Sequence, residues 1–332
     1  MRALLFLCLS LVLTVAFPAP AQQTAEPILV SKPGAFKALV NPNCSHCRDE
    51  AKRRAKDLRG DDRVLCWIRG YSDGGAIPFR FFLVPYRVIS DTYGVFVFDA
   101  DAGFARGFEK SLDFDFHGWR NGVMVMKHKD GTLYSCLTGK AFAGPKKGTR
   151  LKTIPTLVSD WGAWLKNYPQ AVAYHMFDKY QPVEMPTKSE PDSVKSRGPV
   201  DARLPADTPI LGVADGDHAR AIPLDIFAKK NLLHDAIGNK KYVVLWYAPT
   251  RTAAAYLPLA QPPEKIKGEP RALSLVSGKD GTWLDKETGS TWDIAGRAVA
   301  GKLTGWTLTW LDSTQVRWFA WAAEYPKTTL YR

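Results

Sequence analysis

The feature that most constrains the fold of this chain is an internal repeat. Residues of the segment from Gly139 to Tyr174 recur in the segment from Gly296 to Tyr331 at one constant spacing. The recurring pairs are Gly139/Gly296, Ala141/Ala298, Gly144/Gly301, Gly148/Gly305, Leu151/Leu308, Trp161/Trp318, Trp164/Trp321, Tyr168/Tyr325, Pro169/Pro326 and Tyr174/Tyr331. A shorter match relates Ala76–Pro78 to Ala221–Pro223. Self-similarity at the scale of a domain indicates a repeated structural unit, so we predict two diverged copies of one domain.

Each copy is predicted to contain short antiparallel strands and short helices. Apolar runs flank Lys129–Gly131 and Lys279–Gly281, which are typical hairpin turns. One helix is expected after Pro78 and after Pro223, and a second ends at the Tyr-Pro pair of each copy, because proline disfavours a helical residue before it. The predicted fold class is α+β and β-rich.

The tryptophans of the closing helices occur three residues apart, which places them on one helix face. Stacking on sugar rings is one use of such a face, but packing onto the sheets is the better interpretation because the pairs recur in both copies. The expected caps of these helices are Ser159 or Asp160 and Asp312 or Ser313.

Composition divides the chain into segments. We predict a signal peptide at residues 1–21, a lead-in with a Cys-x-x-Cys motif at 22–63, the first copy at 64–180, a linker at 181–206 and the second copy at 207–332. The linker is rich in Pro, Ser, Lys and acidic residues, so we expect it to be exposed, and residues 22–34 to be flexible.

The N-terminus predicts export. Arg2 precedes the apolar run from Leu4 to Phe17, and small residues then favour cleavage after Ala21. The run is too short for a stable membrane anchor, and no other stretch is typical of an integral membrane span. We therefore expect a periplasmic or extracellular protein.

The formal net charge of +12 is compatible with an anionic polysaccharide, a membrane surface or nucleic acid as partner. A solvated basic surface is the plainer interpretation. No basic motif interleaved with aromatic residues is present, so we expect no nucleic-acid partner. The partner is expected to be an unknown protein or a component of the cell envelope.

Several motifs resemble a known family. Ile210–Val213 followed by Gly216–Leu224, then His234–Gly238, and the Gly-x-Ala-x-x-Gly patterns that end at Gly144 and Gly301 resemble the secreted bacterial family catalogued as domain of unknown function 3179. The resemblance covers about residues 64–176 and 207–332. It implies the fold and an exported setting, but no activity.

One departure from that family bears on chemistry. Its members typically carry a Tyr-Cys-Pro-x-Cys segment, which resembles Tyr247–Arg251 in the second copy and Asp99–Gly103 in the first. Both cysteines are missing from both copies. We therefore expect no thiol or metal chemistry of the family type at these segments.

Four cysteines remain after the predicted cleavage: Cys44, Cys47, Cys66 and Cys136. An even number outside the cytoplasm favours disulfides, with Cys66–Cys136 as one bond and the Cys-x-x-Cys pair in the other.

Two alternatives to structural disulfides stay open. Cys44 and Cys47, with His46 between them, stand between a predicted strand at 36–40 and a predicted helix at 48–58. This arrangement resembles a thioredoxin-like redox site. Cys44, His46, Cys47 and Cys66 could instead bind a metal ion.

The remaining polar candidates lack the spacing of known sites. The histidines at 117, 128, 175, 218 and 234 show no ligand spacing, and His218 and His234 are expected to pair with charges or stabilise turns. Asp99, Asp101, Asp113 and Asp115 could flank a glycan, although acids between strand residues more often face solvent. Met124 and Met126 are expected on opposite faces of a strand and not in one cluster.

The sequence therefore favours an exported tandem-repeat protein that binds a partner without catalysis. Thiol–disulfide or metal chemistry at Cys44 and Cys47 is the alternative. We expect no cofactor, with an unidentified metal left open.

Overall fold

The computed structural model describes residues 27–40, 58–69, 73–83, 86–90, 93–109, 113–173, 188–265 and 268–331. Strands dominate these residues and the helices are short, which confirms the predicted β-rich α+β class. Within these ranges, no helix has the length and apolar character needed to cross a membrane.

Two four-stranded sheets have equivalent strand orders, β13-β3-β4-β14 and β26-β15-β16-β27. In each sheet the last strand runs parallel to its neighbour, with Val172 opposite Gly75 in one and Thr329 opposite Arg220 in the other. Val172 and Thr329 are as far apart in the sequence as Gly139 and Gly296, and Gly75 and Arg220 are as far apart as Ala76 and Ala221. The paired residues of the two sheets are therefore equivalent positions of the sequence repeat. The strands are β3 (Arg63–Arg69), β4 (Asp73–Pro78), β13 (Thr156–Asp160), β14 (Val172–Ala173), β15 (Pro209–Asp215), β16 (His218–Pro223), β26 (Ser313–Arg317) and β27 (Thr329–Leu330).

The other sheets consist mainly of strands that lie between these elements in sequence. In the first copy their orders are β12-β7-β6-β5-β2 and β1-β8-β9-β10-β11, and β2 and β1 are edge strands contributed by the lead-in. In the second they are β17-β18-β19-β20, with β25 also paired to β19, and β21-β22-β23-β24. The strands are β1 (Leu29–Ser31), β2 (Lys37–Val40), β5 (Tyr86–Ser90), β6 (Val95–Asp99), β7 (Phe104–Phe108), β8 (Phe114–Arg120), β9 (Val123–His128), β10 (Leu133–Ser135), β11 (Ala141–Ala143), β12 (Thr153–Ile154), β17 (Leu232–Ile237), β18 (Lys240–Tyr247), β19 (Thr252–Gln261), β20 (Arg271–Ala272), β21 (Leu275–Ser277), β22 (Trp283–Asp285), β23 (Thr291–Trp292), β24 (Ala298–Ala300) and β25 (Thr307–Leu311).

The helices are short: α2 (Phe79–Leu83), α3 (Trp161–Asn167), α4 (Pro191–Lys195) and α5 (Trp318–Glu324), with 3-10 turns η1 (Leu224–Ala228) and η2 (Ala248–Thr250). Helices occur as predicted after Pro78 and before each Tyr-Pro pair, whereas the segment after Pro223 forms the 3-10 turn η1, and α4 and η2 are additional elements. The predicted side-chain caps are wrong. Asp160 stands at the N-cap of α3 without a capping hydrogen bond, and Arg317 occupies the same position before α5 because β26 continues up to it.

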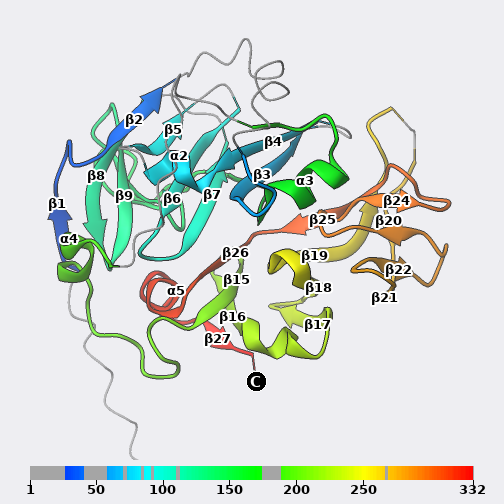
Figure 1. Cartoon of the computed structure of the whole chain (residues 1–332). Coiled ribbons are helices and arrows are strands. Elements are labelled where there is room, and N and C mark those ends of the chain that lie inside the picture. The colour runs from blue at the N-terminus through cyan, green and yellow to red at the C-terminus, as the bar shows by residue number, and fades with distance from the viewer. Residues whose placement is uncertain are drawn as a thin grey trace, which may run out of the picture.

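The two copies share their cores. In β3, Leu65 and Trp67 face a cluster of the first copy, whereas Val64 and Cys66 on the opposite side pack with α3 and with residues of the second copy. The strand β15 behaves in the same way, because one side faces its own copy and the other lies with α5 in a cluster of the first copy. Each opening strand is therefore buried on both sides. Figure 1 shows α3 (green) beside the strands of the second copy, and α5 (red) below those of the first.

The helix tryptophans are core residues, as predicted. Trp164 and Trp321 are 2% and 1% exposed, and each stacks on the tyrosine four residues later with 4.2 Å between ring centroids. Trp321 lies directly over Gly212 of β15, where a β-carbon would come within 2.3 Å of the indole ring. A glycine is therefore required at this contact between helix and sheet.

The connecting segments show two further features. The strands predicted on either side of the Cys-x-x-Cys motif are present as β2 and β3, but β2 pairs in parallel with β5, so the two belong to different sheets. The described part of the expected linker is largely exposed, with two buried contacts. Ser193 and Ser196 are fully buried and hydrogen-bond to the main chain of Gly122.

Candidate functional site

Two equivalent turns contain the positions where the sequence departs from the family that it resembles. Ala100–Gly103 joins β6 to β7, and Ala248–Arg251 joins β18 to β19. The flanking register is the same, with Asp99 opposite Phe104 and Tyr247 opposite Thr252. The main-chain frame of the two turns is thus common to both copies, while their side chains differ.

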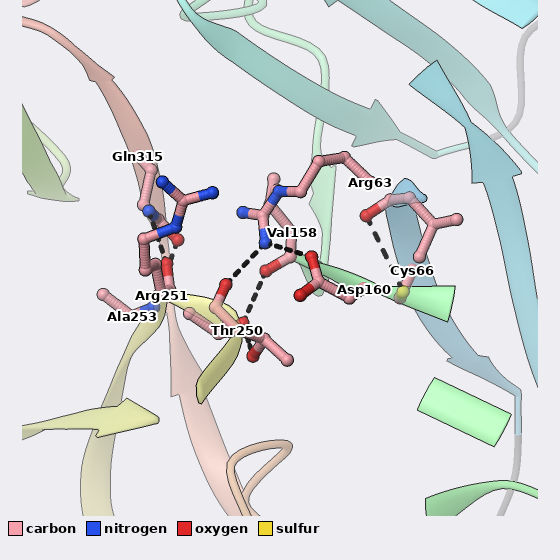
Figure 2. Close-up of polar contacts among 10 residues, drawn as sticks. Arg63, Cys66, Val158, Asp160, Thr250, Arg251, Ala253 and Gln315 are labelled. Carbon is pink, nitrogen blue, oxygen red and sulfur yellow. Dashed lines mark hydrogen bonds and ion pairs between the residues drawn. The ribbon is translucent and has the colours of Figure 1, made fainter. Parts of the chain in front are cut away.

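The turn of the second copy is bonded to the first copy (Figure 2). The guanidinium of Arg63 in β3 donates to the carbonyl of Thr250 at 2.5 Å and to the carboxylate of Asp160 at 2.6 Å. The hydroxyl of Thr252 donates to the carbonyl of Val158 in β13 at 2.6 Å. These bonds join η2 to two strands of the other copy, and we call this set the clamp.

The same turn is also tied to its own copy. Gln315 of β26 donates its side-chain N–H to the carbonyl of Arg251 at 3.0 Å and accepts from the N–H of Ala253 at 3.1 Å. Arg251 adopts a left-handed conformation with φ of 49°. The polar atoms around this turn therefore hold it in place.

The turn of the first copy is organised around a buried carboxylate. Asp99 accepts hydrogen bonds from the N–H groups of Asp101, Ala102 and Met124 at 2.8–3.1 Å. Burial raises the pKa of Asp99 to about 6. Arg317 of the second copy donates its N–H to the carbonyl of Ala102 at 2.8 Å, so this turn also contacts the other copy.

A small pocket lies beside Asp99. Its charged lining residues are Arg87, Asp99, Asp101 and Glu190, and Phe36 contributes an aromatic wall. The guanidinium of Arg87 lies 4.1 Å from the centroid of the Phe36 ring, and burial lowers the pKa of Arg87. Asp101 accepts the N–H of Glu190 at 3.1 Å. The Asp101 carboxylate thus joins this turn to the segment before α4.

The expected Cys66–Cys136 disulfide is not formed. Both thiols are free and fully buried, and they lie in different core clusters. Burial raises the pKa of each thiol well above its ordinary value, so both stay protonated and unreactive. Cys44, His46 and Cys47 lie outside the described residues. Within the described residues, no group of three His, Cys, Asp or Glu side chains is placed to hold a metal ion.

The four aspartates that could flank a glycan do not form a pair of exposed carboxylates. Asp99 and Asp101 are buried, contrary to the expectation that they face solvent, whereas Asp115 is exposed. Asp113 pairs with Lys129 at 2.5 Å. Met124 and Met126 lie in the same core cluster, because residues two apart on a strand share a face, so the expectation that they could not cluster is wrong.

The histidines do not form a site. His117 and His128 contact Ser31 and Asp130, and His234 is exposed, whereas His175 lies outside the described residues. The expected charge pair next to His234 is made by its neighbour Asp235. The Asp235 carboxylate accepts from Arg220 at 2.9 Å and from the hydroxyl of Tyr242 at 2.8 Å.

Sequence reasoning missed the clamp residues Arg63 and Thr250, and also Gln315, which holds the same turn from its own copy. A signal was present one residue before each tryptophan helix, where the equivalent positions hold Asp160 and Arg317. An opposite charge at equivalent positions of a repeat indicates a contact that differs between the copies.

Comparison with known proteins identifies a family for the chain. A family model described as "Protein of unknown function (DUF3179)" matches residues 81–328, which include most of both copies and the segment between them. Comparisons with curated proteins and with solved structures give no match. This family model covers most of the chain, and the chain therefore belongs to the DUF3179 family.

Proposed function

We propose that this protein is an exported binding protein that performs no thiol or metal chemistry in its repeated domain. The observation that carries the proposal is the state of the two equivalent turns. Where the resembling family has cysteines, the chain has Ala248 and Arg251 in one copy and Ala100 and Gly103 in the other. The backbone carbonyls of both turns accept bonds from the opposite copy.

The remaining described thiols support the same proposal. A reactive cysteine needs a stabilised thiolate and access to substrate. Cys66 and Cys136 are fully buried with pKa values raised by burial, which opposes both requirements.

The alternative is redox or metal chemistry at Cys44 and Cys47. The separation of β2 and β3 into different sheets disfavours a thioredoxin-like frame around this motif. Insulin reduction by the full mature chain tests the alternative, with Cys44→Ser/Cys47→Ser as the control. We expect both proteins to give the background rate, and a faster rate for the unaltered chain would establish the redox function instead. Metal content of protein purified under reducing conditions tests metal binding, and we expect none at stoichiometric level.

Export is supported by the basic residue Arg2 and the apolar run that follows it. We expect the mature chain to begin at Gln22. N-terminal sequencing of protein recovered outside the cytoplasm measures this, and an intact Met1 in that fraction would contradict signal cleavage.

A further inference from the structure

The strongest unassigned surface feature is the hairpin of residues 139–152, which we call the basic hairpin. Its basic side chains are all exposed and are Lys140, Lys146, Lys147, Arg150 and Lys152. The sequence from Gly131 to Ser159 contains no Asp or Glu. We propose that the basic hairpin binds an extended acidic polysaccharide, an inference that rests on the proposed function as a binding protein.

The backbone presents these charges in a defined arrangement. The N–H of Ala141 donates to Thr149 at 2.9 Å, and the N–H of Leu151 donates to Gly139 at 2.9 Å, so both sides of the hairpin are paired. Lys140 and Arg150 stand opposite each other in an antiparallel bridge, which directs their side chains to the same face.

Two of the five charges have an ion-pair partner, and three have none among the described residues. Lys146 pairs with Asp130 at 3.0 Å, and Lys152 pairs with Glu109. Lys140, Lys147 and Arg150 form no ion pair with any residue that the structure describes. A cluster of unpaired cations creates a positive potential that attracts an anionic partner.

The fold does not require these charges. The equivalent hairpin of the second copy has the same pairing, since the N–H of Leu308 donates to Gly296 at 2.7 Å. In the second copy, Thr304 and Thr307 occupy the positions of Lys147 and Arg150. The counterpart of Lys140 is Arg297, which is directed inward to Asp293 at 3.3 Å. Lys302 is exposed in the second hairpin, but it stands where the first has Pro145. The three unpaired cations of the first copy therefore have no exposed cationic counterpart in the second.

The shape of the hairpin favours a linear polymer over a membrane. Membrane-surface elements combine basic residues with apolar side chains that enter the lipid. The tip from Gly144 to Gly148 has no large apolar side chain, and Phe142 is half-buried with the guanidinium of Arg120 4.6 Å from its ring centroid. The charges extend over about five residues of extended chain, or roughly 15 Å, which matches several charged units of a polymer.

Binding of the mature chain to immobilised dextran sulfate tests the inference, with uncharged dextran as the ligand control. The variant Lys140→Glu/Lys147→Glu/Arg150→Glu removes the unpaired cations. The matched variant Lys265→Glu/Lys279→Glu/Lys286→Glu makes the same change of net charge at exposed lysines of the second copy. We expect the hairpin variant to bind dextran sulfate about tenfold or more weakly, with a smaller salt dependence, and the matched variant to bind nearly as the unaltered chain.

Equal weakening by both variants would show a general charge effect and overturn the inference. So would equal binding to dextran and dextran sulfate. Vesicles of phosphatidylcholine with 30% phosphatidylglycerol (about the charge density of an anionic membrane) form the third arm, and tighter binding to them than to dextran sulfate would assign a membrane instead. Thermal unfolding of all three proteins checks that the variants fold. A negative result for dextran sulfate binding would not affect the insulin-reduction result. The failure of this inference and the failure of the proposed function can therefore be distinguished.

Discussion

At the scale of single residues, the two copies differ in the hydrogen bond made by the indole N–H of the second helix tryptophan. The indole N–H of Trp321 donates to the hydroxyl of Thr328 at 2.9 Å. The equivalent of Thr328 in the first copy is Ala171, and the buried indole N–H of Trp164 has no acceptor among the described residues. A buried polar group without a partner costs stability, so the first copy retains a local defect.

Ala171→Thr should repair this defect. We expect the free energy of unfolding to rise by about 1 kcal/mol, the net value of one buried hydrogen bond. Gly74 stands where the second copy has Ala219, which leaves room for the added methyl group. Ala171→Val adds the same volume without an acceptor and serves as the control in urea unfolding. An equal effect of the two substitutions would contradict the hydrogen-bond explanation.

Asp99 should make stability depend on pH. Its pKa is about 6 in the folded chain and about 3.8 when exposed, so the folded state binds the proton more tightly between these values. Stability therefore falls as pH rises through this window, and the cost of the buried carboxylate is complete above pH 6. The difference corresponds to up to about 3 kcal/mol.

Asp99→Asn should remove that dependence. We expect the free energy of unfolding of the unaltered chain to fall relative to the variant between pH 4.5 and pH 7.5. Urea unfolding at several pH values measures the difference. Asp113→Asn, at a more exposed carboxyl group, is the control. Parallel pH profiles for the unaltered chain and Asp99→Asn would show that Asp99 does not titrate in this range.

At the scale of elements, the turns between β6 and β7 and between β18 and β19 connect the copies. Arg63 bonds both the strand β13, through Asp160, and the turn η2, through Thr250. The side chains of Arg63 and Asp160 are 24% and 22% exposed, so solvent screens their interaction only in part.

Arg63→Ala should loosen this junction. The substitution leaves the Thr250 carbonyl and the Asp160 carboxylate without their shared donor, and we expect a loss of about 1–2 kcal/mol in unfolding free energy. Lys240→Ala breaks the exposed pair with Asp215 and is expected to cost about 0.5 kcal/mol or less. Chemical denaturation of both variants makes the comparison. A loss for Arg63→Ala no larger than that for Lys240→Ala would show that the clamp does not stabilise the junction.

At the scale of the whole molecule, the shared cores join the copies into one folding unit. The α5 residues Trp318 and Trp321 lie in a cluster with the first copy, and Trp161 and Trp164 of α3 lie in one with the second. Either copy alone would expose these aromatic surfaces to water.

Residues 22–187 and 188–332 should not fold when produced separately. We expect each fragment to bind a hydrophobic dye and to unfold without a cooperative transition. The co-expressed fragments should associate and unfold in one transition, as the intact chain does. Calorimetry and dye fluorescence measure this, and a cooperative transition in the isolated second fragment would contradict the shared core.

Much of the local structure followed from sequence pattern. Alternating apolar runs and turn residues predicted the β-rich class, and proline positions predicted where the helices begin and end. The tryptophan spacing predicted their burial. The candidate site was predictable only as the location of two equivalent segments, because Arg63, Thr250 and Gln315 come from distant parts of the chain.

The sequence by itself determined the strands, the turns and the equivalence of repeated positions, since these depend on local preferences and spacing. Only the tertiary structure decided which surface each copy buries. The pattern of β3 shows that both of its faces are apolar, but not that Cys66 faces the second copy while Leu65 faces the first. For the same reason the pairing of Cys66 with Cys136 could not be judged from their number. Hydrophobic burial has no direction of its own, so the partner of each face is set by the packing of the whole chain.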